Sequence, residues 1–567
     1  MKPAVGLLQR AQLREHQLFL ILTIVVGIVA GLSAVLFTLS IEYMTRRLFG
    51  FSPGAARLFA VPVLVSLVTG ALLAWVFPDV RGSGVPQTEA SYHLSEGVIP
   101  PHVPIGKFFL GVLCIGSGHS MGREGPSVQI GAGLASVIGR WLKLPPGRVR
   151  DLIPVGAAGA LAAAFNTPVA AVLFALEEII GDLNASLIGS TVVASVASVV
   201  VERSILGNEP LFRVPTYRLV HPAELLAYAM LGVIGGFVSL LFCKGLLGLR
   251  RLFLNLPSAT KAIQPAVGGL VIGVVLIYVP AVMGVGYEYV DQALNGELVL
   301  KTLVLLGFVK LAATIVSYSS GNAGGIFAPS LYIGAMVGGA TGVLVHRYAP
   351  FPTGDAGAYA LVGMGTLFAG IIRAPMTSVF MIFEITQDYQ ILVPLMIANM
   401  LSLAISKRYQ PVPVYHALLR QDNIHLPALD ESPSGMRTAR DLMRPAAALI
   451  PHDLPIERAA VLLREEATGV GLVGASDGAL VGRVTRDRVC RMVEDGRGAE
   501  PVEAIVDPEF VHVHPDHPLD LVVERLGESG GLLPVVSRAD VHRLMGVLAV
   551  EDVLGVYRGS PPVPPVE

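Results

Sequence analysis

The chain has 567 residues and a formal net charge of −2, and only 15% of its residues are charged whereas 53% are hydrophobic. Ordinary soluble domains carry about 25% charged residues, so most of this chain is not built to face water. Its near-neutral charge offers no basic surface for nucleic acid, which we exclude as a partner. The cysteines lack the spacing of a zinc site or a disulfide framework: Cys114, Cys243 and Cys490.

Apolar segments with few ionisable residues follow one another from about residue 17 to residue 406, after a short N-terminal segment, residues 1–16. The first apolar run, residues 18–37, has about 20 residues, which is enough to span a bilayer and longer than a signal-peptide core. No small-residue cleavage site follows it. We therefore predict a retained membrane helix at this position.

Basic residues flank the membrane region at both ends: Lys2, Arg10, Arg14, Lys407, Arg408 and Arg420. Lysine and arginine are enriched in cytoplasmic flanks, so both termini are predicted to be cytoplasmic. The expected location is a multi-pass position in a bacterial-type inner membrane.

The membrane region is internally duplicated. Residues 155–178 align without a gap with residues 362–385 at an offset of 207. PSVQIGA at Pro126 likewise aligns with PSLYIGA at Pro329 at an offset of 203. Each half therefore has the same order: a glycine break, a helix that starts at the Pro-Ser pair, and an apolar segment that ends in glutamate.

Glycine and proline interrupt the two halves at residues 82–86, 122–126, 166–168, 324–329 and 373–375. Non-helical backbone at membrane depth is tolerated only where protein or a wet cavity satisfies its polar groups. Duplicated broken helices in transporters usually meet at a substrate site, so we predict an all-α polytopic transport protein with duplicated halves, roughly residues 17–210 and 215–420.

Three of the breaks, GSGVP, GREGP and GGIFAP, place a proline after a short glycine stretch. Proline suits the first turn of a helix because its missing N–H would be unpaired there. The remaining first-turn N–H groups and the positive end of the helix dipole attract an anion. Such dipoles bind an anion weakly enough to release it. Three converging helix ends therefore predict an anion pathway.

Glu124 brings a carboxylate into one of these breaks. An ionisable group at this depth costs several kcal/mol unless it is paired or protonated. The charged side chain can occupy the amides that would hold an anion, and the protonated side chain can leave them, so proton and anion would compete at one place. The alternative is a structural ion pair between Glu124 and Arg123.

These residues resemble the CLC family of chloride channels and chloride/proton antiporters: GSGVP, GREGP, GGIFAP and the tyrosine of PVPVY occur in family order. The resemblance covers roughly residues 17–420. It implies a homodimer with a separate pore in each subunit, and two halves of each subunit that are inverted in the membrane.

The resemblance also implies the site residues. Chloride would be bound by the hydroxyls of Ser83 and Tyr415 and by the amides of Ile326 and Phe327, with Glu124 as the external gate. A serine at position 83 favours chloride over nitrate in this family. Independently, hydroxyl donors strengthen anion binding without adding net charge.

Glu177 and Glu178 end the apolar segment of the first half and point in different directions from one helix. Glu177 has Glu384 as its repeat partner, which favours a shared structural role such as hydrogen bonding to the backbone. Glu178 has Ile385 opposite it. In the family, the second glutamate resembles the internal proton-transfer residue of exchangers; the alternative is a solvated acid at a helix end.

The tail after residue 421 is soluble in composition and is itself repeated. A linker, residues 426–436, precedes two modules, residues 437–497 and 500–560. Short strands such as GLVGA and LLPVV alternate with amphipathic helices such as PIERAAVLLREE, which predicts small α/β units.

The modules resemble a CBS pair, which implies adenine nucleotide as a ligand at Thr485, Asp487 and Asp552. The usual signature is incomplete here, because Thr485 and Asp487 are only two residues apart and Ala549 stands where a hydroxyl is expected. A purely structural role of the modules is the alternative. No other cofactor and no metal is predicted.

The resulting function is chloride/proton antiport by a non-enzymatic homodimer in a lipid bilayer, with Glu124 and Glu178 relaying protons. A passive voltage- or pH-gated chloride channel is the alternative within the class. A CBS-gated divalent-cation transporter would need clustered acidic oxygen ligands in the membrane. An intramembrane hydrolase would need a Ser/His pair, and none stands out around His93, His102 and His119.

Overall fold

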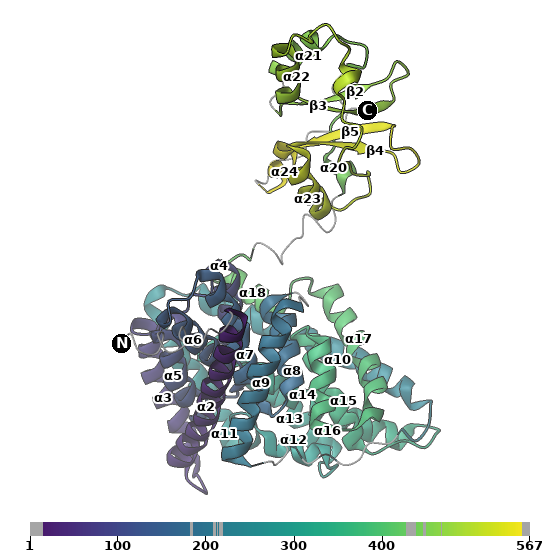
Figure 1. Cartoon of the computed structure of the whole chain (residues 1–567). Helices are drawn as coiled ribbons and strands as arrows, with labels where there is room; N and C mark the ends of the chain where they lie inside the picture. Colours follow the sequence, from purple (N-terminus) through teal and green to yellow (C-terminus); the bar gives the residue numbers. More distant parts are fainter. Residues whose placement is uncertain are drawn as a thin grey trace. The chain divides into compact units, whose positions relative to one another are not determined.

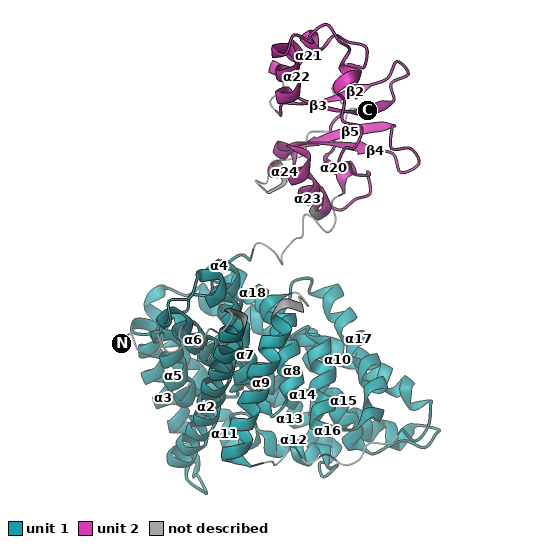
Figure 2. Cartoon of the chain, in the orientation of Figure 1, with its two compact units in different colours: residues 1–426 teal, residues 427–567 magenta. Residues whose placement is uncertain are grey.

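The computed structural model divides the chain into two compact units, residues 1–426 and 427–567 (Figure 2). It describes residues 15–181, 185–207, 211–212, 214, 219–426, 438–445, 449–465 and 468–557. Unit 1 is helical and unit 2 combines short strands with helices, as the sequence predicts (Figure 1). The predicted linker lies almost entirely outside the described residues.

The first half of unit 1 consists of α2 (Glu15–Phe49), α3 (Ala55–Trp75), α4 (Val85–Leu94), α5 (His102–Gly116), α6 (Glu124–Trp141), α7 (Pro146–Phe165), α8 (Pro168–Phe174), a π-helical turn η2 (Ala175–Ile180) and α9 (Ala185–Leu206). The second half repeats this order with α10 (Glu224–Leu254), α11 (Gln264–Tyr278), α12 (Tyr287–Leu294), α13 (Leu300–Ser319), α14 (Phe327–Tyr348), α15 (Ala356–Ile371), α16 (Pro375–Thr386) and α17 (Leu392–Tyr409). A short helix, α18 (Val414–Gln421), follows.

Several of these helices cross a membrane. Within the described residues, seven are long and apolar enough to span a bilayer, and further apolar helices are shorter. The predicted first membrane helix is part of α2, which continues past the apolar run until Gly50, where the backbone turns to a φ of 72°. Glycine adopts this left-handed conformation without strain, so it ends the helix.

All the predicted breaks occur, and each ends in a proline within the first turn of the next helix. Two helices nevertheless begin earlier than the predicted Pro-Ser start, because α6 begins at Glu124 and α14 at Phe327. Pro126 and Pro329 therefore stand third in their helices. A third-position N–H has no intrahelical acceptor, so proline is tolerated there as well as at the first position.

Reciprocal contacts relate the two halves. The Glu177 carboxylate accepts from the amides of Met376 (3.0 Å) and Thr377 (2.8 Å), at the start of α16. The Glu384 carboxylate accepts from the matching amides of α8, those of Val169 (2.9 Å) and Ala170 (2.8 Å). The predicted backbone-bonding role of this glutamate pair is therefore confirmed. A contact made in both directions is the mark of a two-fold axis, which here relates the inverted halves.

Close glycine contacts join neighbouring helices within each half. A Cβ on Gly342 of α14 would lie 2.8 Å from the Cβ of Tyr359 and 2.9 Å from the Cα of Ala356, both on α15. Gly338, one turn earlier, packs against the carbonyl of Tyr359. Gly338 and Gly342 thus form a packing surface between the two helices, as expected for small residues between membrane helices.

Unit 2 contains two small sheets. Strands β1 (Ile450–Pro451), β2 (Val470–Gly474) and β3 (Leu480–Thr485) form one sheet, and β4 (Leu532–Val536) pairs antiparallel with β5 (Leu544–Ala549) in the other. The helices are α20 (Ala439–Leu442), α21 (Ile456–Glu465), α22 (Arg486–Glu494), α23 (Leu519–Ser529) and α24 (Val550–Tyr557).

The two modules of unit 2 exchange their first segments. Ala439 of α20 packs in the core of the second module with Val513 and Leu519, and the Arg444 amide donates to the Val547 carbonyl (2.9 Å). In return, Val502 packs in the core of the first module. Each module is thus completed by a segment that the sequence repeat assigns to the other.

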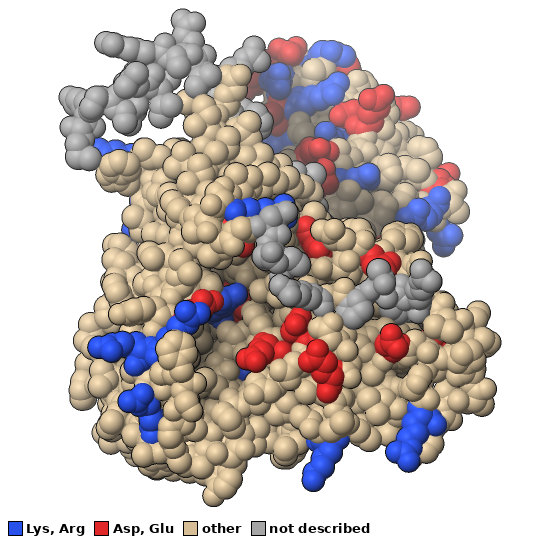
Figure 3. All heavy atoms as spheres, turned by 90° about the horizontal axis from the view of Figure 1, so that it is seen from below, with Lys and Arg blue, Asp and Glu red and all other residues tan. Residues whose placement is uncertain are grey.

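One end face of unit 1 carries charged side chains of both signs. Figure 3 shows acidic side chains gathered near the middle of this face with basic side chains beside them, on a surface that is largely uncharged. Charges of both signs therefore share this face, with no continuous basic surface in that view.

We expect Glu177→Ala and Glu384→Ala to lower the free energy of unfolding by about 2 kcal/mol each, because each leaves two backbone donors of the opposite half without their charged acceptor. Thermal unfolding in detergent measures the loss. Glu297→Ala, at an exposed carboxylate, is the control. Equal stability of all three variants would contradict the reciprocal contact.

Candidate functional site

Three glycine breaks meet at the centre of unit 1. The amides and carbonyls of Gly122 and Gly325 bond to each other in both directions, at 2.7 and 2.8 Å. These two glycines are repeat partners, so the pair lies on the two-fold axis between the halves. The third break joins them, because the Gly82 amide donates to the Asn322 carbonyl (3.1 Å) and the Gly324 amide donates to the Gly82 carbonyl (3.1 Å).

The convergence brings together the N-termini of α4, α6 and α14, which begin directly after the three breaks. The first N–H groups of each helix have no intrahelical acceptor, and the helix dipole adds partial positive charge there. The site therefore offers hydrogen-bond donors and the positive potential of backbone dipoles. Such a place favours an anion.

The hydroxyls of Ser83 and Tyr415 are buried and carry no hydrogen bond within the described part of the chain. Both residues have 0% exposure. Ser83 faces α6, since a Cβ on Gly125 would collide with the Ser83 Oγ and lie 2.9 Å from its carbonyl oxygen. A buried hydroxyl without a partner costs about 1–3 kcal/mol, so these two groups are poised for a ligand.

Ile326 and Phe327 begin α14 and are also buried. Aromatic rings enclose Phe327: the centroids of Phe165, Phe174 and Phe368 lie 4.9, 5.7 and 4.4 Å from its own. Rings around the helix end exclude water and lower the local dielectric constant, which strengthens the attraction between the free amides and an anion.

Glu124 is the first residue of α6 and is fully buried. Its Oε1 accepts a hydrogen bond from the Tyr287 hydroxyl (2.5 Å). Its Oε2 makes no hydrogen bond to the described residues, although it lies beside Gly122 and the Ala328 amide of α14. The Glu124 carboxylate therefore lies at the N-terminus of α14, a helix of the opposite half.

Arg123 makes no ion pair with Glu124 in the described part of the structure; its guanidinium lies over the Tyr287 ring, 5.6 Å from the centroid. The alternative expectation, a structural ion pair between these neighbours, is therefore not what the structure has. The Glu124 carboxylate instead accepts a hydrogen bond from Tyr287 and lies beside the N-terminus of α14.

Glu178 lies in the π-helical turn η2 and is 8% exposed. Single π-turns are frequent at functional sites, because the extra residue redirects a side chain. The charged groups around Glu178 are Glu89, Glu177 and Arg373. The Tyr415 phenol is within electrostatic reach of both Glu178 and Glu124, the two acids that the sequence singles out.

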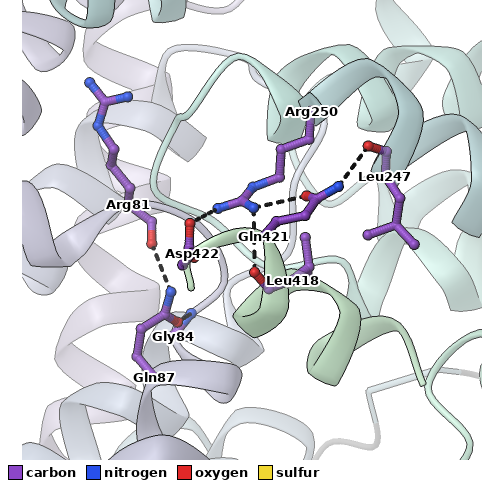
Figure 4. A network of polar contacts seen from close by, with 8 residues as sticks. All are labelled: Arg81, Gly84, Gln87, Leu247, Arg250, Leu418, Gln421 and Asp422. Atoms are coloured by element: carbon purple, nitrogen blue, oxygen red, sulfur yellow. Dashed lines mark hydrogen bonds and ion pairs between the residues drawn. The ribbon is translucent and has the colours of Figure 1, made fainter. Parts of the chain in front are cut away.

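A polar network holds the helix that carries Tyr415. Arg250 of α10 donates to Asp422 (2.6 Å) and to Gln421 (2.9 Å), and Gln421 donates to the Leu247 carbonyl (2.9 Å) (Figure 4). These bonds tie the end of α18 to α10. The position of the Tyr415 hydroxyl is therefore set by contacts at the far end of its own short helix.

The loop that carries Ser83 is held by two side chains. Gln87 accepts from the Gly84 amide (3.0 Å) and lies beside Arg81 (Figure 4). Lys107 donates to the carbonyls of Val80 (2.7 Å) and Gly82 (2.9 Å).

Lys310 makes the matching contacts in the second half, to Val282 (3.1 Å) and Gly284 (2.7 Å). Both lysines are buried, and each anchors one copy of a Val-x-Gly-x-Gly loop.

Sequence reasoning missed Tyr287 and both lysines. A repeat search across residues 80–84 and 282–286, at an offset of 202, would have found the second loop and the residue that follows it. It also missed a buried pair near Glu178, because His416 and Glu89 are far apart in sequence but lie 2.7 Å apart.

No Ser/His pair stands out in the sequence, but the structure brings His119 together with two serines. His119 Nε2 bonds to the Ser66 hydroxyl (2.6 Å), and its Nδ1 bonds to the Ser317 hydroxyl (3.3 Å). All three are buried. Both ring nitrogens are held by hydroxyls, so no carboxylate orients this imidazole as a hydrolytic triad requires. The pair is a satisfied polar contact between α3 and α13.

No group of three or more His, Cys, Asp or Glu side chains able to hold a metal occurs in the described ranges. In unit 2, Asp552 pairs with Arg444 (2.7 Å) and accepts from the Ala549 amide (2.8 Å). Both carboxylate oxygens thus carry protein contacts. Nucleotide binding at Thr485, Asp487 and Asp552 stays a prediction.

Inverted halves with broken helices that direct free amides to one buried point define an inverted-repeat membrane transport protein. A family model described as "Voltage gated chloride channel" matches residues 63–407, and the CBS domain model matches residues 439–495 and 502–559. On this match, the chain belongs to the CLC family, with a C-terminal CBS pair.

Curated relatives include the H(+)/Cl(-) exchange transporter ClcA of Vibrio campbellii, which is 30% identical over 431 residues, 73% of this chain and 92% of the relative. ClcA of Cronobacter sakazakii is 30% identical over 417 residues, 70% and 89% of the two chains. A solved structure of a slow cyanobacterial Cl−/H+ antiporter matches with a TM-score of 0.66 and 27% identity over 73% of this chain and 99% of that one.

A eukaryotic CLC transporter shares the fold over 94% of this chain and 97% of its own, with a TM-score of 0.61 and 20% identity.

We expect Lys310→Met and Lys107→Met to lower the free energy of unfolding by about 3 kcal/mol, because each removes the ammonium that donates to two carbonyls of its loop. After Lys107→Met the Gly82 carbonyl keeps the Gly324 amide as its donor, whereas the Val80 carbonyl loses its bond to Lys107. Thermal unfolding measures the effect, with Lys301→Met, an exposed lysine of α13, as the matched control. Stability equal to that of the control would show that the lysines do not anchor the two loops.

Proposed function

We propose that this chain exchanges chloride for protons across the membrane. The observation that carries the proposal is the pair of buried, unpartnered hydroxyls, Ser83 and Tyr415, beside converging helix N-termini. The names of the curated relatives support the same ions. Ser83, Tyr415 and the amides of Ile326 and Phe327 bind chloride in this proposal.

The donors at this site suit a transported anion. Hydroxyl and amide groups stabilise chloride through partial charges, whereas a fixed cation would hold it too tightly for release. Lys107 supports this distinction: its ammonium is turned to the carbonyls of Val80 and Gly82 and thereby holds the loop of Ser83. The Lys107 ammonium thus donates to the backbone of the Ser83 loop.

Glu124 and Glu178 carry protons in this mechanism. Charged Glu124 occupies the helix end that an anion would use, and protonation releases it. Glu178 aligns with Ile385 in the second half. The first half therefore has a carboxylate at this position and the second half has none. This asymmetry favours coupled exchange over the passive chloride channel, which needs no second acid.

The assembly and location follow from the family. We propose a homodimer with one pathway in each subunit, placed in the inner membrane with both termini in the cytoplasm. Lysine and arginine at both ends of the membrane region support this orientation. The CBS pair would then act from the cytoplasmic side, either as a regulator or as a structural support.

A flux assay in liposomes tests the coupling. An imposed proton gradient is expected to drive chloride uphill, and Glu178→Val is expected to abolish proton movement while chloride still moves. Glu42→Val, at an exposed glutamate of α2, should behave as the unmodified protein. Chloride that moves only downhill in the unmodified protein would establish the passive channel instead.

The anion site itself is tested by Gly122→Ala. A Cβ there would meet the Glu124 carboxylate and lie 3.1 Å from the Ala328 amide, so the crowded helix end should bind bromide at least about tenfold more weakly. Calorimetric titration measures the affinity. Gly147→Ala is the control, because a Cβ at this exposed glycine has nothing within 4 Å. Unchanged bromide affinity would place the anion elsewhere.

A further inference from the structure

We propose that Tyr287 latches the Glu124 gate: its hydroxyl holds the charged carboxylate in the anion pathway and thereby sets how readily chloride displaces it. This rests on the proposed function, in which the carboxylate and chloride compete for one place. The Tyr287 latch means the hydrogen bond from Tyr287 Oη to Glu124 Oε1.

The latch is a short contact in a buried setting. The two oxygens are 2.5 Å apart and Glu124 has no solvent exposure. A hydroxyl that donates to a carboxylate forms a bond roughly twice as strong as one between neutral groups. The other oxygen, Oε2, lies beside the Ala328 amide without a hydrogen bond. The latch is therefore the one side-chain hydrogen bond to this carboxylate within the described residues.

The loop before α12 fixes the tyrosine. Tyr287 is the first residue of α12, and Gly286 precedes it with a φ of 80°, which favours glycine. A Cβ on Gly286 would lie 2.8 Å from the Tyr332 ring. Lys310 holds the same loop through the carbonyls of Val282 and Gly284. These contacts of the loop backbone fix where the Tyr287 side chain begins.

The ring itself is held on two sides. The Phe212 ring lies edge-on at 5.1 Å, and the Arg123 guanidinium lies 5.6 Å from the centroid. These contacts keep the hydroxyl directed at Glu124. Four ionisable groups face the Glu124 carboxylate from the elements around it: Arg123, Tyr287, Lys310 and Tyr415. Among them, the described structure has a side-chain hydrogen bond to Glu124 from Tyr287 alone.

The repeat explains why one gate serves the pathway. Ser83 and Val285 are repeat partners, and so are Val85 and Tyr287, at an offset of 202. The first copy of the glycine loop therefore supplies a hydroxyl before its helix, whereas the second copy supplies one at the first helical residue. The two halves place their hydroxyls at different points: one beside the bound anion, the other on the competing carboxylate.

A cavity adjoins the latch and gives a released side chain room to move. It has a volume of about 480 Å³, and Phe165, Phe212, Asn166 and Arg203 are among its lining residues. Phe212 also touches Tyr287, and Phe165 also touches Phe327, so two residues that line the cavity contact the latch tyrosine and the start of α14. Its lining contains both the Arg203 guanidinium and the Glu384 carboxylate, together with neutral polar side chains.

Tyr287→Phe tests the latch because it removes only the hydroxyl. Without the donor the blocking carboxylate is held less firmly, so chloride flux at alkaline pH should rise about tenfold. Flux at acidic pH, where Glu124 is protonated and out of the way, should stay unchanged. Bromide should also bind more tightly at alkaline pH, since its competitor is weakened. Equal flux and affinity in the variant and the unmodified protein would overturn the latch.

The matched control is Tyr359→Phe, which also removes a buried phenol that donates to a carboxylate, Glu224 (3.2 Å), away from the pathway. It should leave the pH profile of chloride flux as it is. A site-specific fluorinated tyrosine at position 287, a stronger donor of nearly the same size, should lower flux at alkaline pH. It tests the latch even if the phenylalanine variant does not fold.

Glu124→Gln separates this inference from the proposed function. If Glu124 gates chloride, Glu124→Gln alone abolishes the pH dependence of flux, and Tyr287→Phe then adds nothing to it. If Glu124→Gln changes flux but Tyr287→Phe does not, the latch is wrong and the gate stands. If Glu124→Gln leaves flux and its pH profile unchanged, the proposed function itself fails.

Discussion

Buried hydrogen-bond donors that the fold leaves without partners are the constraint on which the rest of unit 1 depends. Within the described residues, the hydroxyls of Ser83 and Tyr415 are buried without a hydrogen-bond partner, and the start of α14 is buried as well. Each unsatisfied donor destabilises the folded protein, so a negatively charged group must complete the site. Chloride and the Glu124 carboxylate are the two candidates. In the proposed function, these two groups compete for the same donors.

Much of this arrangement can be predicted from the sequence because glycine and proline determine where helices stop and start. The duplication places the breaks in corresponding positions of each half, and it correctly identifies Glu177 and Glu384 as a pair that bonds to the backbone. The contrast of Glu178 with Ile385 is likewise visible without coordinates. Each of these predictions depends on the repeat spacing, which shows within a single sequence that two residues about 200 positions apart occupy equivalent places.

The features that the sequence did not predict depend on contacts between distant segments. Tyr287 meets Glu124 across 163 residues, and neither flanking pattern indicates that contact. The Ser66 and His119 pair lies between two helices whose facing sides cannot be known before they are packed. Helices α6 and α14 begin before their Pro-Ser pairs because the residues ahead of the prolines already have helical backbone angles. Local sequence patterns do not predict these contacts or these helix starts.

The exchange of carboxylates between the halves has a consequence for how the protein is made. While the ribosome has produced only the first half, the opening amides of α8 have no acceptor, because Glu384 has not yet been synthesised. The Glu177 carboxylate likewise has no amides of α16 to accept from, because α16 has not been synthesised either. The early intermediate in the membrane is therefore an unfinished structure with exposed backbone polarity, and insertion of the later helices is the step that closes it.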